Sequence, residues 1–387
     1  MRTAIVVGAG SEKERYKGMN IGILSMQRIY NYGSFLQAYA LKATLEGMGH
    51  KVYFVDIERI NKKTVSKPQN SLQKLLSRKE YIDRYLFKRY LYSKKNAEMD
   101  QMFRKIQKEY FGISPGEEHV SARGCDMVVI GSDEIFNCEP NSQWGVTSQR
   151  FGDIPGMTTI SYAASCGYTS ITDIVKKDRA IIKEALRKMK AISVRDQNTL
   201  EFVQYFGIKN ASINLDPVFI YAFDQEICEA ECLGWPNYPY MVVYAYHNRI
   251  EKKEEVNTIK KYAKNRGLRT IAIGGSLPWC DEFAVISPFQ VLVYFKHADC
   301  IVTDTFHGTV MAAKLNKPLA VLVRESNKNK LGDLLNRISI ESHRVDCIEC
   351  LKDILDKPLN YESANRIIEN EKQRALLYLQ SALEMEQ

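Results

Sequence analysis

The sequence predicts an α/β protein built from two units, each a parallel sheet with helices on both faces. Three observations support this prediction. The chain has 387 residues, enough for two domains of ordinary size, and 45% of them are hydrophobic. Short apolar runs alternate with longer amphipathic segments in the rhythm of strands and helices. Polar residues follow several of the apolar runs, where open α/β sheets bind their ligands.

The first unit is expected over residues 19–232. Residues 1–18 precede it and are interpreted as a leader or a mis-started extension, because charged residues replace the apolar helix that should follow their hydrophobic run. Strands are expected at 20–26, 51–56, 125–130, 158–163 and 191–194, and helices at 34–46, roughly 70–110 and roughly 171–189.

A linker and a second unit follow. Gly234, Pro236 and Pro239 mark residues 233–239 as the linker. The second unit is expected over 240–360, and residues 361–387 contain an amphipathic helix that is expected to pack back on the first unit. Strands are expected at 240–245, 270–273, 300–303 and 319–323, and a helix near 250–265.

Composition excludes several classes of protein. No apolar run approaches the roughly 18–20 residues that cross a bilayer, and the N-terminal run is too short for a secretory signal. The nine cysteines are odd in number and scattered, which argues against a disulfide framework. Cys347 and Cys350 form a CxxC without a second pair at zinc-finger spacing, so they are expected to be plain thiols. We therefore expect a cytoplasmic protein.

Much of the net charge of +8 lies between Lys62 and Lys108, where basic residues recur among aromatic and aliphatic ones. Three interpretations remain open. The segment is a solvated helical face, or a patch that meets anionic lipid at the inner face of the membrane. Nucleic-acid binding is the third, but no RNA or DNA motif accompanies the charge, so no nucleic-acid partner is expected.

The segment from Cys300 to Thr309 carries the strongest functional signal. It is an apolar strand that ends in polar residues, after which a helix begins at Gly308 and Thr309. His307 is thereby placed at the carboxyl end of a strand and beside the free N–H groups of a helix N-terminus, a natural anion site. An imidazole in that position indicates acid–base chemistry on a negatively charged substrate.

Six short motifs in order resemble those of the polysaccharide pyruvyl transferase family. The resemblance covers about residues 19–350. The motifs are Asn31-Tyr-Gly33 with Leu36-Gln-Ala-Tyr-Ala-Leu41, Gly131-Ser-Asp133-Glu-Ile-Phe-Asn137, Ser161-Tyr-Ala-Ala-Ser165, Ser193-Val-Arg195-Asp196, Asp216-Pro217 and Thr303-Asp-Thr-Phe-His307-Gly308.

The resemblance implies a glycosyltransferase-B-like architecture, with two Rossmann-like domains facing a central cleft. It implies transfer of a pyruvate ketal from phosphoenolpyruvate to a sugar of a cell-envelope or exported polysaccharide, with release of phosphate. The acceptor is expected to be free or lipid-linked. Neither a metal nor a cofactor is expected, and the remaining histidines show no metal-ligand spacing.

The motif residues receive roles from this resemblance. His307 is the expected catalytic acid–base group, and its alternative is a buried histidine that only orients the loop. Asp133 follows a strand, where its carboxylate accepts a proton from a sugar hydroxyl or fixes the acceptor, and its alternative is a helix cap. Arg195 is expected to bind the donor, since a guanidinium pairs with a carboxylate or phosphate through two parallel bonds. Asn31 and Gly33 lie in the first loop, where they contact the acceptor or form the turn.

The donor side is expected to involve further residues of the second unit. Some family members carry an arginine where this chain has Thr305, so donor contacts are expected to fall to Arg195, Arg324 or Lys330. Asp304 either orients His307 or caps the next helix. The loop residues expected to contact the donor's phosphate or lie beside it are Asp304, Thr305, Gly308 and Thr309, and Ser326-Asn327 fits a helix start that adds backbone donors.

Two other functions remain open. A glycosyltransferase of the same architecture would use a nucleotide-sugar donor, and residues 274–276, Gly-Gly-Ser, would bind its diphosphate. A non-catalytic scaffold of a polysaccharide-assembly complex is the other, and the intact His307 and Arg195 argue against it.

Overall fold

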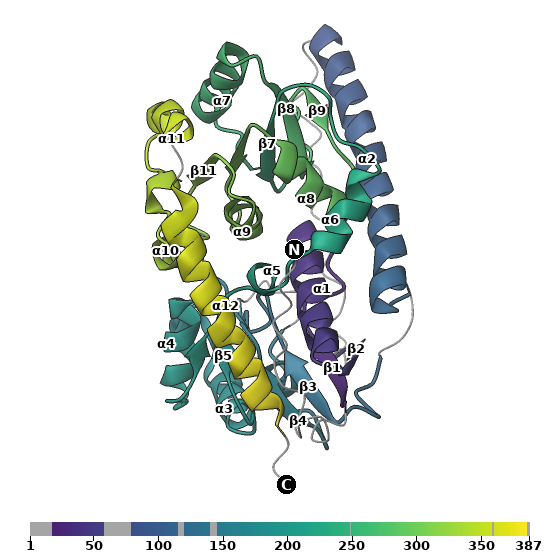
Figure 1. Cartoon of the computed structure of the whole chain (residues 1–387), viewed down its shortest axis with the longest axis vertical. Coiled ribbons are helices and arrows are strands. Elements are labelled where there is room, and N and C mark those ends of the chain that lie inside the picture. Colours follow the sequence, from purple (N-terminus) through teal and green to yellow (C-terminus); the bar gives the residue numbers. More distant parts are fainter. Residues whose placement is uncertain are drawn as a thin grey trace, which may run out of the picture.

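The computed structural model describes residues 18–57, 79–114, 120–139, 145–247, 249–357 and 360–384, with the side chains of 79–93 excepted. It contains two α/β units, one above the other in Figure 1, each built on a parallel sheet. The units face each other, which is a glycosyltransferase-B-like arrangement. The expected leader lies outside the described residues, as does most of the basic segment before residue 79.

The N-terminal unit has a four-stranded parallel sheet in the order β2-β1-β3-β4. A two-stranded pair, β5 and β6, continues it, because Ile160 bridges to Ala191 and Ala164 to Val194. The elements are β1 (Asn20–Leu24), α1 (Tyr32–Gly47), β2 (Lys51–Phe54), α2 (Lys79–Phe111), β3 (Met127–Ile130), β4 (Thr158–Ser161), α3 (Lys176–Leu186), β5 (Ser193–Val194), α4 (Gln197–Tyr205), β6 (Ser212–Ile213), α5 (Pro217–Ile220) and α6 (Asp224–Glu231).

The C-terminal unit has a six-stranded parallel sheet in the order β12-β11-β10-β7-β8-β9. Because β11, β10 and β7 are neighbours, the polar residues that follow them meet at one edge of the sheet. The elements are β7 (Tyr240–Ala245), α7 (Lys253–Asn265), β8 (Arg269–Gly274), β9 (Glu282–Phe283), α8 (Pro288–His297), β10 (Cys300–Thr303), α9 (Phe306–Lys314), β11 (Leu319–Leu322), α10 (Lys328–Arg337), β12 (Arg344–Val345), α11 (Leu351–Asp356) and α12 (Tyr361–Leu383).

Most expected strands and helices are present, with differences at their ends. Helix α1 begins at Tyr32 rather than at residue 34, because the side chain of Asn31 accepts from the first free amides and caps it. The helix expected from 171 begins only at Lys176, since a separate 3-10 turn (Ile171–Asp173), closed by a capping box at Ser170, comes first. The elements that were not predicted from the sequence are α4, β6, α5, α6, β9, α8, β12 and α11.

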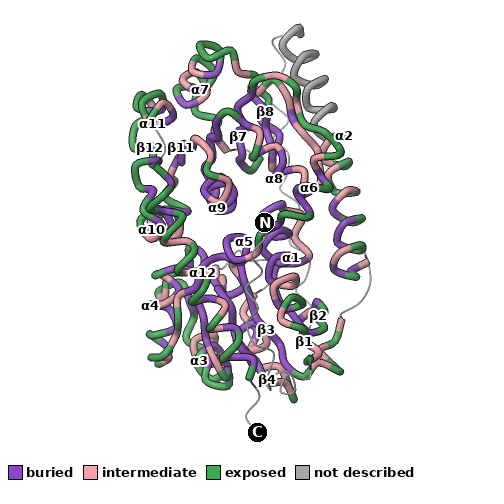
Figure 2. The backbone as a smooth tube through the Cα atoms, in the orientation of Figure 1, coloured by how far each residue is buried: buried purple, intermediate pink, exposed green. Residues whose placement is uncertain are grey.

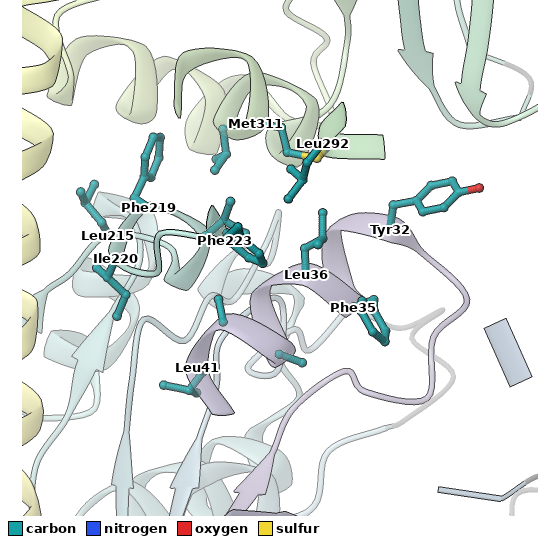
Figure 3. Packing of buried hydrophobic residues seen from close by; sticks show 14 of the residues in the cluster. Tyr32, Phe35, Leu36, Leu41, Leu215, Phe219, Ile220, Phe223, Leu292 and Met311 are labelled. Atoms are coloured by element: carbon teal, nitrogen blue, oxygen red, sulfur yellow. The ribbon is translucent and has the colours of Figure 1, made fainter. Parts of the chain in front are cut away.

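A shared hydrophobic core joins the two units. Figure 3 shows Leu36 of α1 and Phe223 facing Leu292 of α8 and Met311 of α9. All four side chains are fully buried. In Figure 2 the tubes of α1, α5 and α9 near the middle of the molecule are largely purple, the colour of buried residues. The relative position of the units is therefore set by packing rather than by the linker alone.

Helices α12 and α10 add contacts between the units. Helix α12 runs from the upper unit down along the lower one, where the Tyr378 hydroxyl donates to the Ser161 carbonyl at 2.8 Å. Arg337 of α10 donates to the backbone carbonyls of Ile213 at 3.0 Å and Asn214 at 3.3 Å, and pairs with Glu371 of α12. These bonds hold the C-terminal half against the strands that carry Arg195.

Replacing Leu292 by Ala is expected to destabilise the whole chain by about 2–5 kcal/mol, because it leaves a cavity in the shared core. Chemical denaturation followed by circular dichroism and by intrinsic fluorescence should give one coincident transition. The matched control is Leu377→Ala on α12, whose side chain is 63% exposed, and it should change stability by no more than about 0.5 kcal/mol. Two separate transitions would show that the units fold independently.

Candidate functional site

A cavity of about 400 Å³ lies where the two units face each other. It receives residues from the carboxyl ends of strands in both units. Those from the N-terminal unit are Met26, Ile29, Asn31, Ser34, Asp133, Glu134, Glu139, Tyr168 and Arg195, and those from the C-terminal unit are Tyr246, Arg249, Asp304, Thr305, Phe306, His307, Ser326, Asn327 and Lys330.

Three helix N-termini border this cavity. The N-cap residues of α1, α9 and α10 are Asn31, Thr305 and Asn327, and all three line it. The first amides of a helix have no carbonyl partner within the helix, and the helix dipole favours negative charge there. Convergence of three such ends makes the cavity suited to an anionic group.

His307, the second residue of α9, packs directly on the backbone of Gly33 in the other unit. A methyl group added to Gly33 would lie 2.2 Å from Cγ and 2.3 Å from Nδ1 of the imidazole. Any side chain at residue 33 would therefore occupy the space of the ring. Gly33 was expected to form a turn or contact a ligand, and the structure shows that it makes room for the histidine.

The other side of the imidazole faces a carboxylate. Nε2 of His307 lies 3.4 Å from Oδ2 of Asp216, without the angle of a hydrogen bond. Such contacts tighten when a substrate fixes the ring. The histidine is 4% exposed and lines the cavity, so it is buried yet reachable by a ligand.

Arg195 connects two carboxylates beneath the cavity. One terminal nitrogen donates to Asp216 at 2.9 Å and the other to Asp133 at 3.4 Å. Its guanidinium lies over the ring of Phe306, 4.2 Å from the centroid. Nε has no hydrogen-bond partner within the described residues. The alternative to donor binding for Arg195 was an ion pair with Asp196 or another neighbour; the structure shows ion pairs with Asp216 and Asp133, while Asp196 caps α4 through the Thr199 amide.

Asp133 and Asp216 are both held in the ionised form. Burial alone would raise the pKa of Asp133, but His307 and Arg195 outweigh it, and the Ser34 hydroxyl, which donates at 2.6 Å, adds to the lowering. Burial acts in the same direction on Asp216, and the same two neighbours again bring its pKa below the ordinary value. Asp133 does not cap a helix; it lies at φ 67° beneath the cavity.

Asp304 neither orients His307 nor caps α9, so these two expectations are wrong, while its expected place beside the donor stays a prediction. Thr305 is the N-cap, and its hydroxyl accepts from the Gly308 amide. Asp304 instead accepts from Nε of Arg324 at 3.3 Å, and its other oxygen has no partner in the part of the chain that the structure describes. Burial raises the pKa of Asp304 despite Arg324.

The other expected donor-side residues divide into two groups. Thr305 and Lys330 line the cavity, and Lys330 pairs with Glu134 across the unit boundary. Gly308, Thr309 and Arg324 are absent from its described lining. The Thr309 hydroxyl donates to the Thr305 carbonyl at 2.9 Å, and Arg324 binds Glu255 through both terminal nitrogens. A Cβ at Gly308 would lie 2.3 Å from the Thr303 hydroxyl, so this glycine serves close packing.

Sequence reasoning missed several residues of the site. Asp216 was recognised only as part of an Asp-Pro motif, although it contacts both His307 and Arg195. Arg249 and Tyr246 follow β7, and their position after a strand was the available signal. Other lining residues without a predicted role follow or lie near the expected strand ends, and they are Met26, Ile29, Ser34, Glu134, Glu139, Tyr168 and Phe306.

Acidic and basic side chains are balanced around the cavity. The carboxylates of Asp133, Glu134, Glu139 and Asp304 share the lining with Arg195, Arg249 and Lys330. The net charge of +8 is therefore not concentrated here. The cavity therefore offers an anion hydrogen-bond donors, namely backbone amides at helix N-termini and guanidinium N–H groups. It does not offer a large excess of positive charge.

Within the described residues there is no group of three or more side chains placed to hold a metal ion. The described helices include none that is both long enough and apolar enough to span a bilayer.

A family model for polysaccharide pyruvyl transferase matches residues 31–326 of the sequence.

The chain belongs to the polysaccharide pyruvyl transferase family. The matched residues run from the N-cap of α1 to the loop before α10. They include the cavity lining except for Met26, Ile29, Asn327 and Lys330. The family is one of transferases. No curated protein matches the chain.

Solved structures with a similar chain course include UGT89C1 from Arabidopsis thaliana complexed with UDP-L-rhamnose, at 11% identity and a TM-score of 0.49, with 95% of this chain and 99% of that one covered. A putative UDP-N-acetylglucosamine 2-epimerase from Listeria monocytogenes has 11% identity and a TM-score of 0.49, covering 96% and 98%. The glycosyltransferase SnogD from Streptomyces nogalater has 12% identity and a TM-score of 0.40, covering 95% and 100%. Identities of 11–12% and TM-scores below 0.5 carry no information about the reaction of this chain.

Asp304→Asn is expected to make stability less dependent on pH. The folded-state pKa of Asp304 is raised by burial, so its favourable contribution is present below the unfolded value of about 3.9 and is lost as pH rises through the folded value. The free energy of unfolding of the wild type, minus that of Asp304→Asn, should therefore fall between pH 4 and pH 8. Urea titrations at half-unit steps measure it, and a difference that rises with pH would contradict the burial argument.

Proposed function

We propose that this family member transfers a pyruvate-derived group from phosphoenolpyruvate to two hydroxyls of a sugar, which forms a ketal and releases phosphate. The observation that carries the proposal is the fixed imidazole of His307. It lies between Gly33 and Asp216, in a cavity bordered by three helix N-termini. This combination supports proton transfer to or from a substrate that carries a carboxylate and a phosphate.

In the proposed reaction a proton adds to the methylene carbon of the enol, and one sugar hydroxyl bonds to the adjacent carbon as its own proton leaves. The bond from that carbon to the phosphate oxygen then breaks. The second hydroxyl bonds to the same carbon and loses its proton. Of the two protons released, one replaces the proton added to carbon and the other leaves with phosphate, so the reaction is balanced without a redox step.

His307 is the proposed proton donor to the methylene carbon. Its Nε2 faces Asp216, which leaves Nδ1 as the nitrogen for the substrate. An ionised carboxylate behind the ring stabilises the protonated imidazole and fixes its orientation. Asp216 is suited to this task because its pKa lies below the ordinary value, despite burial, owing to His307 and Arg195.

The acceptor sugar is proposed to lie on the N-terminal side of the cavity. Carboxylates of Asp133, Glu134 and Glu139 provide acceptors for sugar hydroxyls there. Because the pKa of Asp133 is lowered, mainly by His307 and Arg195 against the effect of burial, it is better suited to orient a hydroxyl than to remove its proton. Tyr168 and Tyr246 are 45% and 38% exposed at the same cavity and offer aromatic faces to a sugar ring.

The nucleotide-sugar alternative receives no support from the loop expected to bind a diphosphate. A Cβ at Gly275 would lie 2.3 Å from the His247 amide nitrogen, so this loop is packed against the chain after β7. Ser276 is buried, and its hydroxyl contacts Nδ1 of His247 at 3.2 Å. Residues 274–276 do not contribute to the described lining of the cavity.

A cytoplasmic location is part of the proposal, supported by the odd number of scattered cysteines. The exported or cell-envelope nature of the polysaccharide, and a lipid-linked acceptor at the inner face of the membrane, also belong to the proposal. The basic residues before α2 that suggested the membrane contact lie largely outside the described residues.

Replacing His307 by Gln should abolish phosphate release from phosphoenolpyruvate in the presence of a sugar acceptor, while the melting temperature stays within a few degrees. Loss of a general acid costs about 10²–10⁴-fold in rate. A colorimetric phosphate assay against a panel of glycosides with adjacent hydroxyls measures it. Full activity of the variant would remove His307 from the chemistry, and unfolding would make its role structural.

Gly33→Ala should lower the same activity by about 100-fold or more, because the added methyl group displaces the imidazole. Gly47→Ala is the matched control in the same helix: a methyl group there meets nothing within 4 Å, and activity should remain at the wild-type level. Equal activity of the two variants would show that the contact between Gly33 and His307 does not position the ring.

A further inference from the structure

The cavity offers three cationic side chains besides His307 for an anionic donor. They are Arg195, Arg249 and Lys330. A planar carboxylate is best bound by a guanidinium with two N–H groups free to point at it. Which of these cations retains free donors therefore decides where the carboxylate of the donor binds.

Two of the three are already engaged by protein carboxylates. Arg195 donates through one terminal nitrogen to Asp216 at 2.9 Å and through the other to Asp133 at 3.4 Å. Only its Nε has no partner within the described residues, and its side chain is 2% exposed, against 33% for Arg249. Lys330 pairs with Glu134. Arg324, which the sequence had suggested as a donor contact, binds both oxygens of Glu255 at 2.6 and 2.9 Å and lies outside the described lining of the cavity.

Arg249 differs from these in its contacts. Its shortest side-chain hydrogen bond is to the Ser326 hydroxyl at 3.4 Å, and its distance to the nearest oxygen of Asp304 is 3.8 Å. Both contacts are long for charge-assisted bonds, which are usually about 2.7–2.9 Å. The side chain is 33% exposed, so the guanidinium is open to the cavity while it is anchored from behind.

The backbone around Arg249 holds it at the correct edge of the sheet. It follows β7, and its amide donates to the Tyr246 carbonyl at 3.2 Å in a turn. Its side chain spans from the end of β7 to Ser326, the residue before the N-cap of α10. The guanidinium thus lies beside a helix N-terminus and next to Asp304, the residue before Thr305.

We propose that Arg249 binds the carboxylate of the donor, through both terminal nitrogens, at the N-terminus of α10. This inference rests on the proposed function and assigns to Arg249 the part of the substrate that remains in the product. The phosphate is then left to the N-termini of α9 and α1, on the side of His307.

Asp304 does not prevent this binding. Arg324 and Glu255 neutralise each other behind it, so Asp304 and Arg249 face the ligand as a pair. Burial raises the pKa of Asp304, and a bound carboxylate favours its protonated form further. The raised pKa and the contact with Arg324 both reduce the repulsion between Asp304 and a bound carboxylate.

Calorimetric titration of the full-length protein tests the assignment without an acceptor sugar. The probes are phosphoenolpyruvate, 2-phosphoglycolate and inorganic phosphate. For Arg249→Met the dissociation constants of the two carboxylate-bearing probes should rise about 10- to 100-fold, while that of inorganic phosphate stays within about twofold. Arg249→Lys should recover only part of the loss, since an ammonium cannot bind both oxygens in one plane.

Arg266→Met is the matched control. Arg266 is also a half-exposed arginine paired with an aspartate, Asp356, but it lies at the end of α7 and outside the cavity lining. It should leave all three dissociation constants within about twofold of the wild type. This control excludes a general effect of lost positive charge.

Other outcomes would overturn the assignment. An Arg249→Met protein that binds phosphoenolpyruvate as the wild type does would show that the residue does not contact the donor. An equal loss for inorganic phosphate would show that it binds the phosphoryl group instead. A wild-type protein that binds inorganic phosphate but neither carboxylate-bearing probe more tightly would overturn the proposed function, and this inference with it.

Discussion

The contact between His307 and Gly33 is the constraint on which the site depends. The histidine belongs to the C-terminal unit and the glycine to the N-terminal one, and the ring occupies the space that a side chain at residue 33 would fill. The contact exists only because α1, α5, α8 and α9 share one buried core. Burial of apolar surface far from the cavity therefore positions the group that is proposed to move the proton.

Electrostatic balance is the second requirement. His307 and Arg195 together lower the pKa values of Asp133 and Asp216 against the effect of burial, and Asp216 in turn faces His307. An uncompensated charge in such a place would be strongly unfavourable, so each member needs the others. In the proposed function the roles separate along the cavity: the carboxylates of one side orient sugar hydroxyls, and helix amides with the Arg249 guanidinium bind the anionic donor on the other.

Much of the fold and part of the candidate site were predictable from the sequence. The alternation of apolar runs and amphipathic segments predicted most strands of both sheets, and polar residues after strands indicated His307, Asp133 and Arg195 as site residues. The ring's glycine neighbour and its carboxylate partner were not predictable, because Gly33 and Asp216 are far from His307 in the chain and only tertiary packing brings them together. The proposed role of Arg249 was not predictable for the same reason, because the spacing of residues in a sequence does not show which arginines already donate their N–H groups to protein carboxylates.

Isotope incorporation tests the central claim most directly. Ketal product formed in deuterium oxide from phosphoenolpyruvate and an accepted sugar is isolated and examined by mass spectrometry and proton NMR. Protonation of the enol carbon by an exchangeable imidazole predicts a single deuterium in the methyl group of every ketal. A product without deuterium in that methyl group, or a glycoside in place of a ketal, would contradict the account.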